Sequence, residues 1–230
     1  MTGAHQEYRS LGANVVRHLL PHRRPFLFVD RIKRYRLGEA RFIEAAFQVS
    51  ASHPVFDGHF PDWAVWPGVY VVEGLGQTAQ LLATLDAIRR AGAEREDPGL
   101  GLRTLDALDS AYSLRPDASP SDEGLALLEE TSRAPIVGLA SRIDVRFLEP
   151  VLPGCRLDYR ADWTLEQNGV MAFDVEASVG GRPVVRGELG ANEGDGVVGI
   201  LGRCGDAGTD SPDGLVGDDG RRGEIDVRQG

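Results

Sequence analysis

Hydrophobic and polar residues along this chain form patterns typical of several strands and one long helix. Residues 26–32 (FLFVDRI) form an apolar, β-branched run, and residues 41–49 (RFIEAAFQV) alternate between apolar and polar side chains, so both segments predict strands. Turn-forming residues separate the later apolar stretches. Further strands are predicted in the second half of the chain, at residues 136–147, 157–167, 170–180 and 183–193.

The strongest helical signal covers residues 69–90. Pro67-Gly68 is a typical helix start, because the first N–H groups of a helix have no intrahelical acceptor and proline is tolerated there. The segment is apolar on nearly every side, which indicates a buried helix. No other helix of comparable length is expected, so a sheet wrapped around this one would bury it most simply. The pattern therefore predicts an α+β fold.

A polar stripe runs along this otherwise apolar helix. Glu73, Gln77, Gln80 and Thr84 follow one another at intervals that place them on one narrow face. A solvent-facing stripe is one interpretation, although such stripes usually carry Lys and Arg. A hydrogen-bonded line inside the protein or at an interface is the other, and the two amides beside a single carboxylate favour it.

Two segments do not follow the pattern of the body. Residues 92–135 are polar, acidic and interrupted by Pro and Gly, with short helical patches, so we expect an insertion that forms a lid or a partly disordered loop. The Gly- and Asp-rich residues 194–230 predict a disordered tail. The expected organisation is one domain, residues 1–193, that contains the insertion and precedes the tail.

The net charge of −10 is concentrated in these two segments. Residues 92–135 hold 10 Asp/Glu and 4 Arg, and residues 191–230 hold 9 Asp/Glu and 4 Arg, so the remaining chain is close to neutral. It has no basic patch interleaved with aromatic residues, and we do not expect nucleic-acid binding. We find no apolar run of membrane-spanning length and no apolar leader at the N-terminus, so a cytoplasmic protein without a membrane segment is predicted.

The sequence offers few signals for cofactors. Cys155 and Cys204 lie far apart and lack the spacing of metal ligands, so no metal is expected. We find no glycine-rich phosphate loop, which argues against a nucleotide cofactor, and no G-x-S-x-G nucleophile motif. The basic run at residues 31–36 (RIKRYR) has two interpretations, a solvated edge or a docking patch for an acidic partner.

Residues 58–74 (GHFPDWAVWPGVYVVEG) hold the candidate chemistry. His59 precedes the predicted helix, and Glu73 lies in its second turn. A neutral histidine is a suitable general base near neutral pH, and a buried carboxyl that stays protonated is a suitable general acid. Gly68 lies between them at the helix N-terminus, where free N–H groups can stabilise an oxyanion. Together they suit proton abstraction beside a thioester, followed by loss of a β-hydroxyl. The alternative is structural: His59 caps a turn and Glu73 meets an arginine.

Three separated motifs resemble those of the hotdog-fold β-hydroxyacyl-ACP dehydratases of the FabZ type. The motifs lie in residues 20–32 (LPHRRPFLFVDRI), 53–82 (with GHFP, WPGV and EGLGQ) and 141–154 (SRIDVRFLEPVLPG). The resemblance covers about residues 18–92 and 136–192. It implies a hotdog fold, in which an antiparallel sheet wraps around one long central helix.

The resemblance also implies roles for individual residues. His59 would take the α-proton, Glu73 would protonate and expel the β-hydroxyl as water, and the Gly68 N–H would polarise the thioester carbonyl. Gln77 would hold the Glu73 carboxyl in place. The predicted contacts with substrate are Phe60, Trp63, Trp66, Val69 and Gln77.

The family further implies partners and assembly. The substrate would be a (3R)-hydroxyacyl thioester on an acyl carrier protein, and the product a trans-2-enoyl thioester, with no metal or organic cofactor. His59 and Glu73 of one site would come from different subunits, so a homodimer or a higher homo-oligomer is expected. Because the carrier is acidic, Arg31, Lys33, Arg34 and Arg36 become a candidate landing site.

The chain departs from the family pattern around the expected tunnel mouth. Asp62 and Trp63 follow GHFP where a small residue is usual, and Trp66 replaces a more compact apolar residue. With the insertion and the tail, these departures suggest a specialised lipid or polyketide-like pathway. Two other functions stay open: a hotdog acyl thioesterase, which does not need the GHFP histidine, and a non-catalytic hotdog partner subunit.

Overall fold

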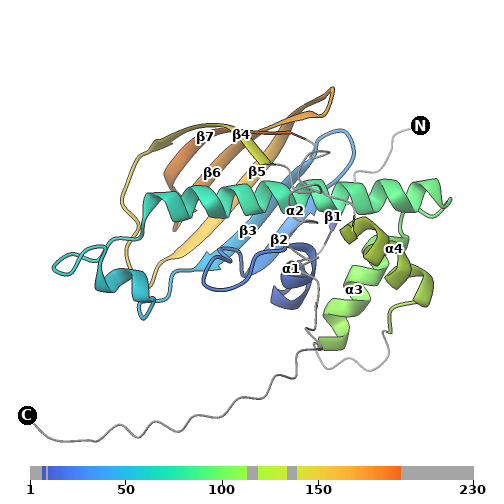
Figure 1. Cartoon of the computed structure of the whole chain (residues 1–230), viewed down its shortest axis with the longest axis horizontal. Helices are drawn as coiled ribbons and strands as arrows, with labels where there is room; N and C mark the ends of the chain where they lie inside the picture. The colour runs from blue at the N-terminus through green and yellow to red at the C-terminus, as the bar shows by residue number, and fades with distance from the viewer. Residues whose placement is uncertain (1–6, 9, 113–118, 134–138, 193–230) are drawn as a thin grey trace, which may run out of the picture.

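One antiparallel sheet and one long helix dominate the structure, a computed structural model that describes residues 7–8, 10–112, 119–133 and 139–192 (Figure 1). In this part of the chain the sheet has seven strands in the order β1-β2-β3-β5-β6-β7-β4. The strands are β1 (Glu7–Tyr8), β2 (Arg31–Arg36), β3 (Phe42–Gln48), β4 (Leu139–Phe147), β5 (Arg156–Gln167), β6 (Val170–Val179) and β7 (Arg182–Asn192). The helices are α1 (Ala13–Leu19), a 3₁₀ turn (Pro54–Asp57), α2 (Gly68–Glu94), α3 (Leu100–Tyr112) and α4 (Asp122–Arg133).

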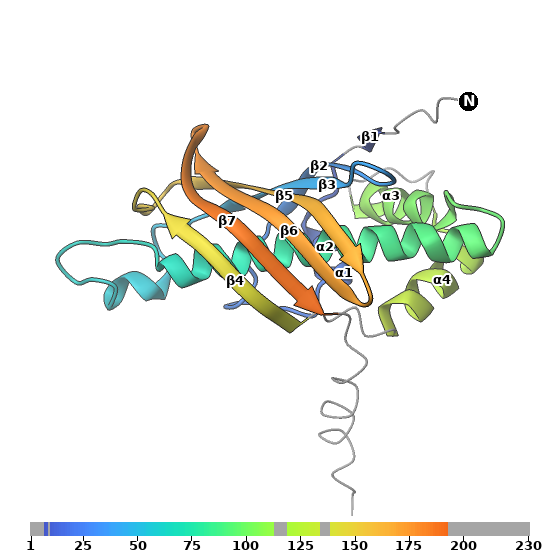
Figure 2. The same cartoon turned by 90° about the horizontal axis from the view of Figure 1, so that it is seen from above.

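Helix α2 runs along one face of the sheet, as Figures 1 and 2 show. Half of its residues are buried, including Leu75, Leu82 and Leu85, which are inaccessible to solvent. Gly74 permits the close approach of helix and sheet, since a Cβ at this position would lie 2.3 Å from the Tyr159 hydroxyl oxygen on β5. The predicted α+β hotdog arrangement, with a sheet around a central helix, is confirmed.

The first predicted strand is displaced in the structure. Residues 26–30 are not a strand; they cross α2 as an extended segment in which Phe28 and Val29 are buried. The basic run 31–36 forms β2 instead, with Ile32 and Tyr35 facing the core. A register shift between Ile32 and Arg34 lets consecutive basic residues stay on the outer side. The prediction was wrong because continuous hydrophobicity marks a buried segment without marking a strand.

The other predicted elements agree with the structure within a few residues. The segment 41–49 forms β3, the helix expected at 69–90 is α2, and the four later strands are β4 to β7. Strand β1 and helix α1 were not predicted. Helix α1 has only seven residues, too few for a clear helical period, and it is fixed by the burial of Val15, Val16 and Leu19.

In its described part, the insertion 92–135 forms two helices, which contain the short helical patches that the sequence predicted. Helices α3 and α4 pack beside the C-terminal half of α2 (Figure 2), and Leu105 and Leu127 are inaccessible to solvent there. The Asp109 carboxylate of α3 accepts a hydrogen bond of 2.9 Å from the Gly12 N–H, which joins the insertion to the start of α1. The predicted tail, residues 194–230, lies outside the described residues. No helix in the described part of the chain is long and apolar enough to cross a membrane.

Candidate active site

His59 lies in the loop before α2, and hydrogen bonds fix both its backbone and its ring. Its N–H donates to the Val55 carbonyl at 2.9 Å, and its carbonyl accepts from the Val65 N–H at 3.0 Å. The ring Nδ1 lies 2.7 Å from the Val65 carbonyl oxygen. A carbonyl oxygen only accepts hydrogen bonds, so Nδ1 carries the proton. In the neutral ring, Nε2 therefore holds the free lone pair that a general base needs.

Gly68 lines the same pocket as His59, a space of about 320 Å³ between the start of α2 and the link that follows β4. As the first residue of α2, Gly68 has an N–H without an intrahelical acceptor, at the end of the helix that favours negative charge. A Cβ here would lie 2.6 Å from Cε1 of Phe147, so a larger residue would push against β4. The pocket thus combines a possible base with a possible oxyanion donor.

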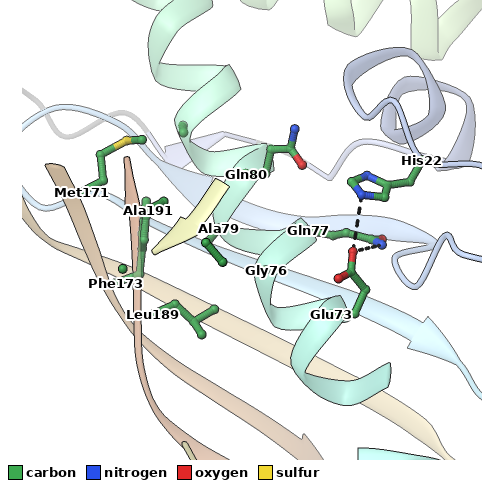
Figure 3. A pocket seen from close by; sticks show the side chains of 13 residues that line it. His22, Glu73, Gly76, Gln77, Ala79, Gln80, Met171, Phe173, Leu189 and Ala191 are labelled. Atoms are coloured by element: carbon green, nitrogen blue, oxygen red, sulfur yellow. Dashed lines mark hydrogen bonds and ion pairs between the residues drawn. The ribbon is translucent and has the colours of Figure 1, made fainter. Parts of the chain in front are cut away.

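Glu73 lines a second pocket, of about 260 Å³, between α2 and strands β4, β6 and β7 (Figure 3). Gln77 donates from Nε2 to Glu73 Oε1 at 2.9 Å. The orientation of the Gln77 amide is fixed, because its Oε1 accepts from the Phe28 N–H at 2.9 Å and its Nε2 also donates to the Phe26 carbonyl at 2.8 Å. Gln77 is almost completely buried, with 1 % exposure. The segment before β2 therefore holds Gln77, and Gln77 holds the carboxyl group.

His22 also faces Glu73 and was not singled out from the sequence as a site residue. Its Nε2 lies 3.4 Å from Glu73 Oε1, and Figure 3 shows the ring above the carboxyl group. The two residues are 51 positions apart, so no periodic pattern could connect them. The available signal was a histidine inside the motif LPHRRPFLFVDRI. His53, by contrast, has a local role, since its Nδ1 accepts from the Val55 N–H and caps the 3₁₀ turn.

The structure does not bring His59 and Glu73 of one chain into a common pocket. Gly68 and Glu73 are five residues apart on α2, which corresponds to about 7.5 Å along the helix axis and about 140° around it. His59 and the Gly68 N–H therefore lie on one flank of α2, and the Glu73 carboxyl group lies on another. A small substrate in one chain cannot reach all three groups.

The predicted substrate contacts fall into two groups. Phe60, Trp63 and Val69 are exposed to 51 %, 64 % and 68 %. Trp66 is 1 % exposed and packs among aromatic rings, including Phe28 at 5.8 Å between centroids. Trp66 also lines the His59 pocket, although most of its side chain packs in the core. In the described residues, no group of three or more His, Cys, Asp or Glu side chains could hold a metal ion.

Comparison with known families matches a FabA-like domain over residues 20–101. This range contains His22, His59, Gly68, Glu73 and Gln77. Both pockets described above therefore draw residues from the matched segment.

Curated relatives extend the similarity over most of the chain. The 3-hydroxyacyl-[acyl-carrier-protein] dehydratase FabZ of Nitratiruptor sp. is 30 % identical over 176 residues, which cover 76 % of this chain and 93 % of the relative. FabZ of Dichelobacter nodosus is 30 % identical over 179 residues, which cover 78 % and 94 %. Among solved structures, the dehydratase heterocomplex ApeI:P from Xenorhabdus doucetiae matches with a TM-score of 0.48 and 16 % identity, over 81 % of this chain and 95 % of that one.

Proposed function

Because the chain belongs to the FabZ family of 3-hydroxyacyl-[acyl-carrier-protein] dehydratases, we propose that it removes water from a (3R)-hydroxyacyl thioester on an acyl carrier protein. The product is a trans-2-enoyl thioester. The reaction breaks a C2–H bond and the C3–O bond and forms a C2–C3 double bond, so it needs a base, an acid and a group that stabilises charge on the thioester oxygen.

Three residues take these roles in the proposed mechanism. His59 Nε2 removes the C2 proton, and the negative charge that moves onto the thioester oxygen is stabilised by the Gly68 N–H at the start of α2. Glu73 donates its proton to the C3 hydroxyl, which leaves as water. The proton on His59 and the charge on Glu73 are then exchanged with solvent, and no cofactor takes part.

The observation that carries this proposal is the hydrogen bond between His59 Nδ1 and the Val65 carbonyl at 2.7 Å. It fixes the tautomer in which Nε2 is the base, and it does so beside the free N–H of Gly68 in one pocket. A histidine that only capped a turn would not need to lie in a pocket beside the N–H of Gly68.

A second copy of the chain supplies Glu73 in this proposal. Strand β4 is the last strand of the sheet in the described residues, and Ile143 and Phe147 on it are each 56 % exposed. Near the His59 pocket, Val69 and Leu148 are also exposed. Exposed apolar side chains along an unpaired edge mark an interaction surface. A homodimer through this surface would cover it and would bring Glu73 of one subunit toward His59 of its partner.

The carrier protein is the proposed partner, and β2 offers part of a docking face. Lys33 and Arg34 are paired with carboxylates of the sheet, at 3.2 Å with Asp158 and 2.7 Å with Glu44, so their charge is partly neutralised. Arg31 and Arg36 have no carboxylate partner among the described residues. We therefore propose that Arg31 and Arg36 are the residues of β2 that contact the carrier protein.

A specialised lipid or polyketide-like pathway is part of the same proposal. Two features support a specialised pathway. Trp63 is exposed in the same loop as His59, and the insertion adds helices α3 and α4 to the body of the domain. The substrate would then differ from the ordinary fatty-acid intermediate in its acyl group.

The test is turnover of a 3-hydroxyacyl thioester on a carrier protein, followed in both directions by enoyl formation and enoyl hydration. We expect wild-type turnover and a loss of about 10²- to 10⁴-fold in kcat for His59→Ala, the usual contribution of a general base. Release of free acid and carrier thiol, retained in His59→Ala, would identify a thioesterase instead. Absence of both products with the wild type would support the non-catalytic partner and overturn the proposal.

A further inference from the structure

His22 approaches the carboxyl group of Glu73 from outside α2. It lies on the loop between α1 and β2, and its Nε2 is 3.4 Å from Glu73 Oε1, longer than an ordinary hydrogen bond. Catalytic hydrogen bonds are often long in the free protein and shorten when substrate binds. The side chains of His22 and Glu73 are 26 % and 31 % exposed, so both are partly shielded from water.

Hydrogen bonds hold the backbone on both sides of His22. On one side, Arg23 Nη1 donates hydrogen bonds of 2.7 Å to the carbonyls of Leu20 and His22. On the other side, Gln77 is bonded to the backbone of Phe26 and Phe28. The loop that carries His22 is therefore bonded to the first half of α2, and its ring lies beside Glu73.

Burial determines which ring nitrogen of His22 carries the proton. Nδ1 is inaccessible to solvent and has no hydrogen-bond partner among the described residues. A buried N–H without an acceptor is rare and costly, and a buried charged ring without one is costlier still. The neutral ring with its proton on Nε2 avoids both. This nitrogen faces Glu73, so His22 presents a donor to the carboxyl group.

Both neighbours of Glu73 address the same oxygen. Gln77 donates to Oε1 at 2.9 Å, and His22 Nε2 lies near Oε1 as well. In Figure 3 the second oxygen of Glu73 is turned away from both. An oxygen with one N–H donor bonded to it and a second donor 3.4 Å away is a poor site for a proton, so the acidic proton belongs on Oε2. After that proton leaves, two donors remain to stabilise the charge.

We propose that His22 is a positioning residue for Glu73, which places the acidic proton on Oε2 and stabilises the carboxylate that forms when the proton is transferred. This inference rests on the proposed function, in which Glu73 is the acid. His22 acts through Glu73 and does not itself touch the substrate.

No other charged group competes for this role in the pocket. Among the described residues that line it, His22 and Glu73 are the only titratable ones. Gln77 and Gln80 of α2 are neutral, and β4, β6 and β7 contribute apolar side chains and glycine. The nearby Arg23 guanidinium is turned onto backbone carbonyls. A change at His22 therefore alters the surroundings of Glu73 without a second charge that compensates.

The experiment compares three substitutions at His22 in the full chain. His22→Leu removes the donor and should lower kcat about 10- to 100-fold, the range for a hydrogen bond to a charged group, with KM changed less than about twofold. Loss of the donor also makes the Glu73 proton harder to remove, so the alkaline limb of the kcat–pH profile should move to higher pH. His22→Gln places an amide N–H near Oε1 and should restore most of the rate.

Two controls separate positioning from a structural effect. His18→Leu changes an exposed histidine of α1 and should leave kcat and the pH profile as in the wild type. His22→Asn keeps a polar side chain that is too short to reach Glu73, and should be impaired like His22→Leu. If His22→Leu does not fold, the contrast between Gln and Asn tests the same point.

The outcomes distinguish this inference from the proposed function. A wild type without dehydratase turnover overturns both. An active wild type whose His22→Leu and His22→Asn variants keep the wild-type kcat, or lose it without a shift of the alkaline limb, overturns the role of His22 alone.

Discussion

Single carboxylates in this protein have very different surroundings, and Glu166 is paired with two arginines. At the end of β5 it accepts two hydrogen bonds from Arg90 of α2, at 2.8 and 2.7 Å, and one from Arg41 at 2.7 Å. The hydrogen bond from Arg90 is the largest cause that holds the pKa of Glu166 below its usual range, and Arg41 adds to it. On the outer face of the sheet, Arg34 and then Arg160 likewise lower the pKa of Glu44.

These lowered pKa values predict a loss of stability in acid. A carboxyl group with a lower pKa in the folded state stabilises the fold above its unfolded pKa, about 4.3 for glutamate, and loses that contribution as the pH falls through the folded value. We expect Glu166→Gln to lower the free energy of unfolding at pH 7, by about 0.2–1 kcal/mol for a partly exposed pair, and to match the wild type near pH 3. Urea unfolding at both pH values measures this.

Glu39 is the matched control, an exposed residue in the turn before β3 for which no ion pair is found in the described part of the chain. Glu39→Gln should leave stability unchanged at both pH values. An equal deficit of Glu166→Gln at pH 3 and pH 7 would show that its effect is packing rather than charge.

At the scale of elements, glycines set how closely α2 approaches the sheet. A Cβ on Gly74 would meet the Tyr159 hydroxyl at 2.3 Å, whereas a Cβ on Gly76, two residues later, would meet nothing within 4 Å. Burial raises the pKa of the Tyr159 hydroxyl, so this group stays neutral at the end of its ring. Glu73 directly precedes Gly74 on α2 and depends on the same helix placement.

Alanine at the two glycines should therefore have opposite effects on stability. Gly76→Ala should stabilise the protein by up to about 1 kcal/mol, since alanine is the better helix former. Gly74→Ala should destabilise it by about 1–3 kcal/mol despite the same propensity gain, because the helix must move or Tyr159 must leave its rotamer. Thermal unfolding of both variants measures these effects. Equal melting temperatures for the two variants would contradict the close approach of α2 to Tyr159 at Gly74.

At the scale of the whole molecule, the separation of His59 from Glu73 is the central feature. Each lies in its own pocket, on a different flank of α2. Strand β4, the last strand in the described part of the sheet, carries the exposed Ile143 and Phe147 and lies next to the His59 pocket. If two copies associate through this edge, each dimer has two sites. Each site then combines His59 of one chain with Glu73 of the other.

Mixed dimers test this arrangement directly. His59→Ala and Glu73→Gln chains with different tags are co-expressed, and dimers with both tags are purified. One of the two sites then holds both intact residues, so we expect about half of the wild-type kcat per dimer, although either variant alone is inactive. Dimers that pair Glu73→Gln with a His59→Ala/Glu73→Gln double variant are the control and should stay inactive. Inactive mixed dimers would place the whole site in one chain.

The site residues differ in how far the sequence could predict them. His59, Gly68, Glu73 and Gln77 lie within 20 residues, where helix period and turn chemistry relate them. His22 comes to Glu73 only because Gln77 binds the backbone of a segment about 50 residues earlier. Trp66 lines the His59 pocket, as its position suggested, but that it is also part of the core depends on aromatic rings far away in the sequence.

The sequence by itself determined the long buried helix, its start at Pro67-Gly68 and the strands with clear alternation, because local periodicity and backbone sterics decide these. Only the tertiary structure decided that residues 26–30 cross the helix without forming a strand, that α3 and α4 of the acidic insertion pack beside α2, and that His22 faces Glu73. These features depend on contacts between residues far apart in the chain. Such contacts form only when the sheet, the helix and the loop share one core.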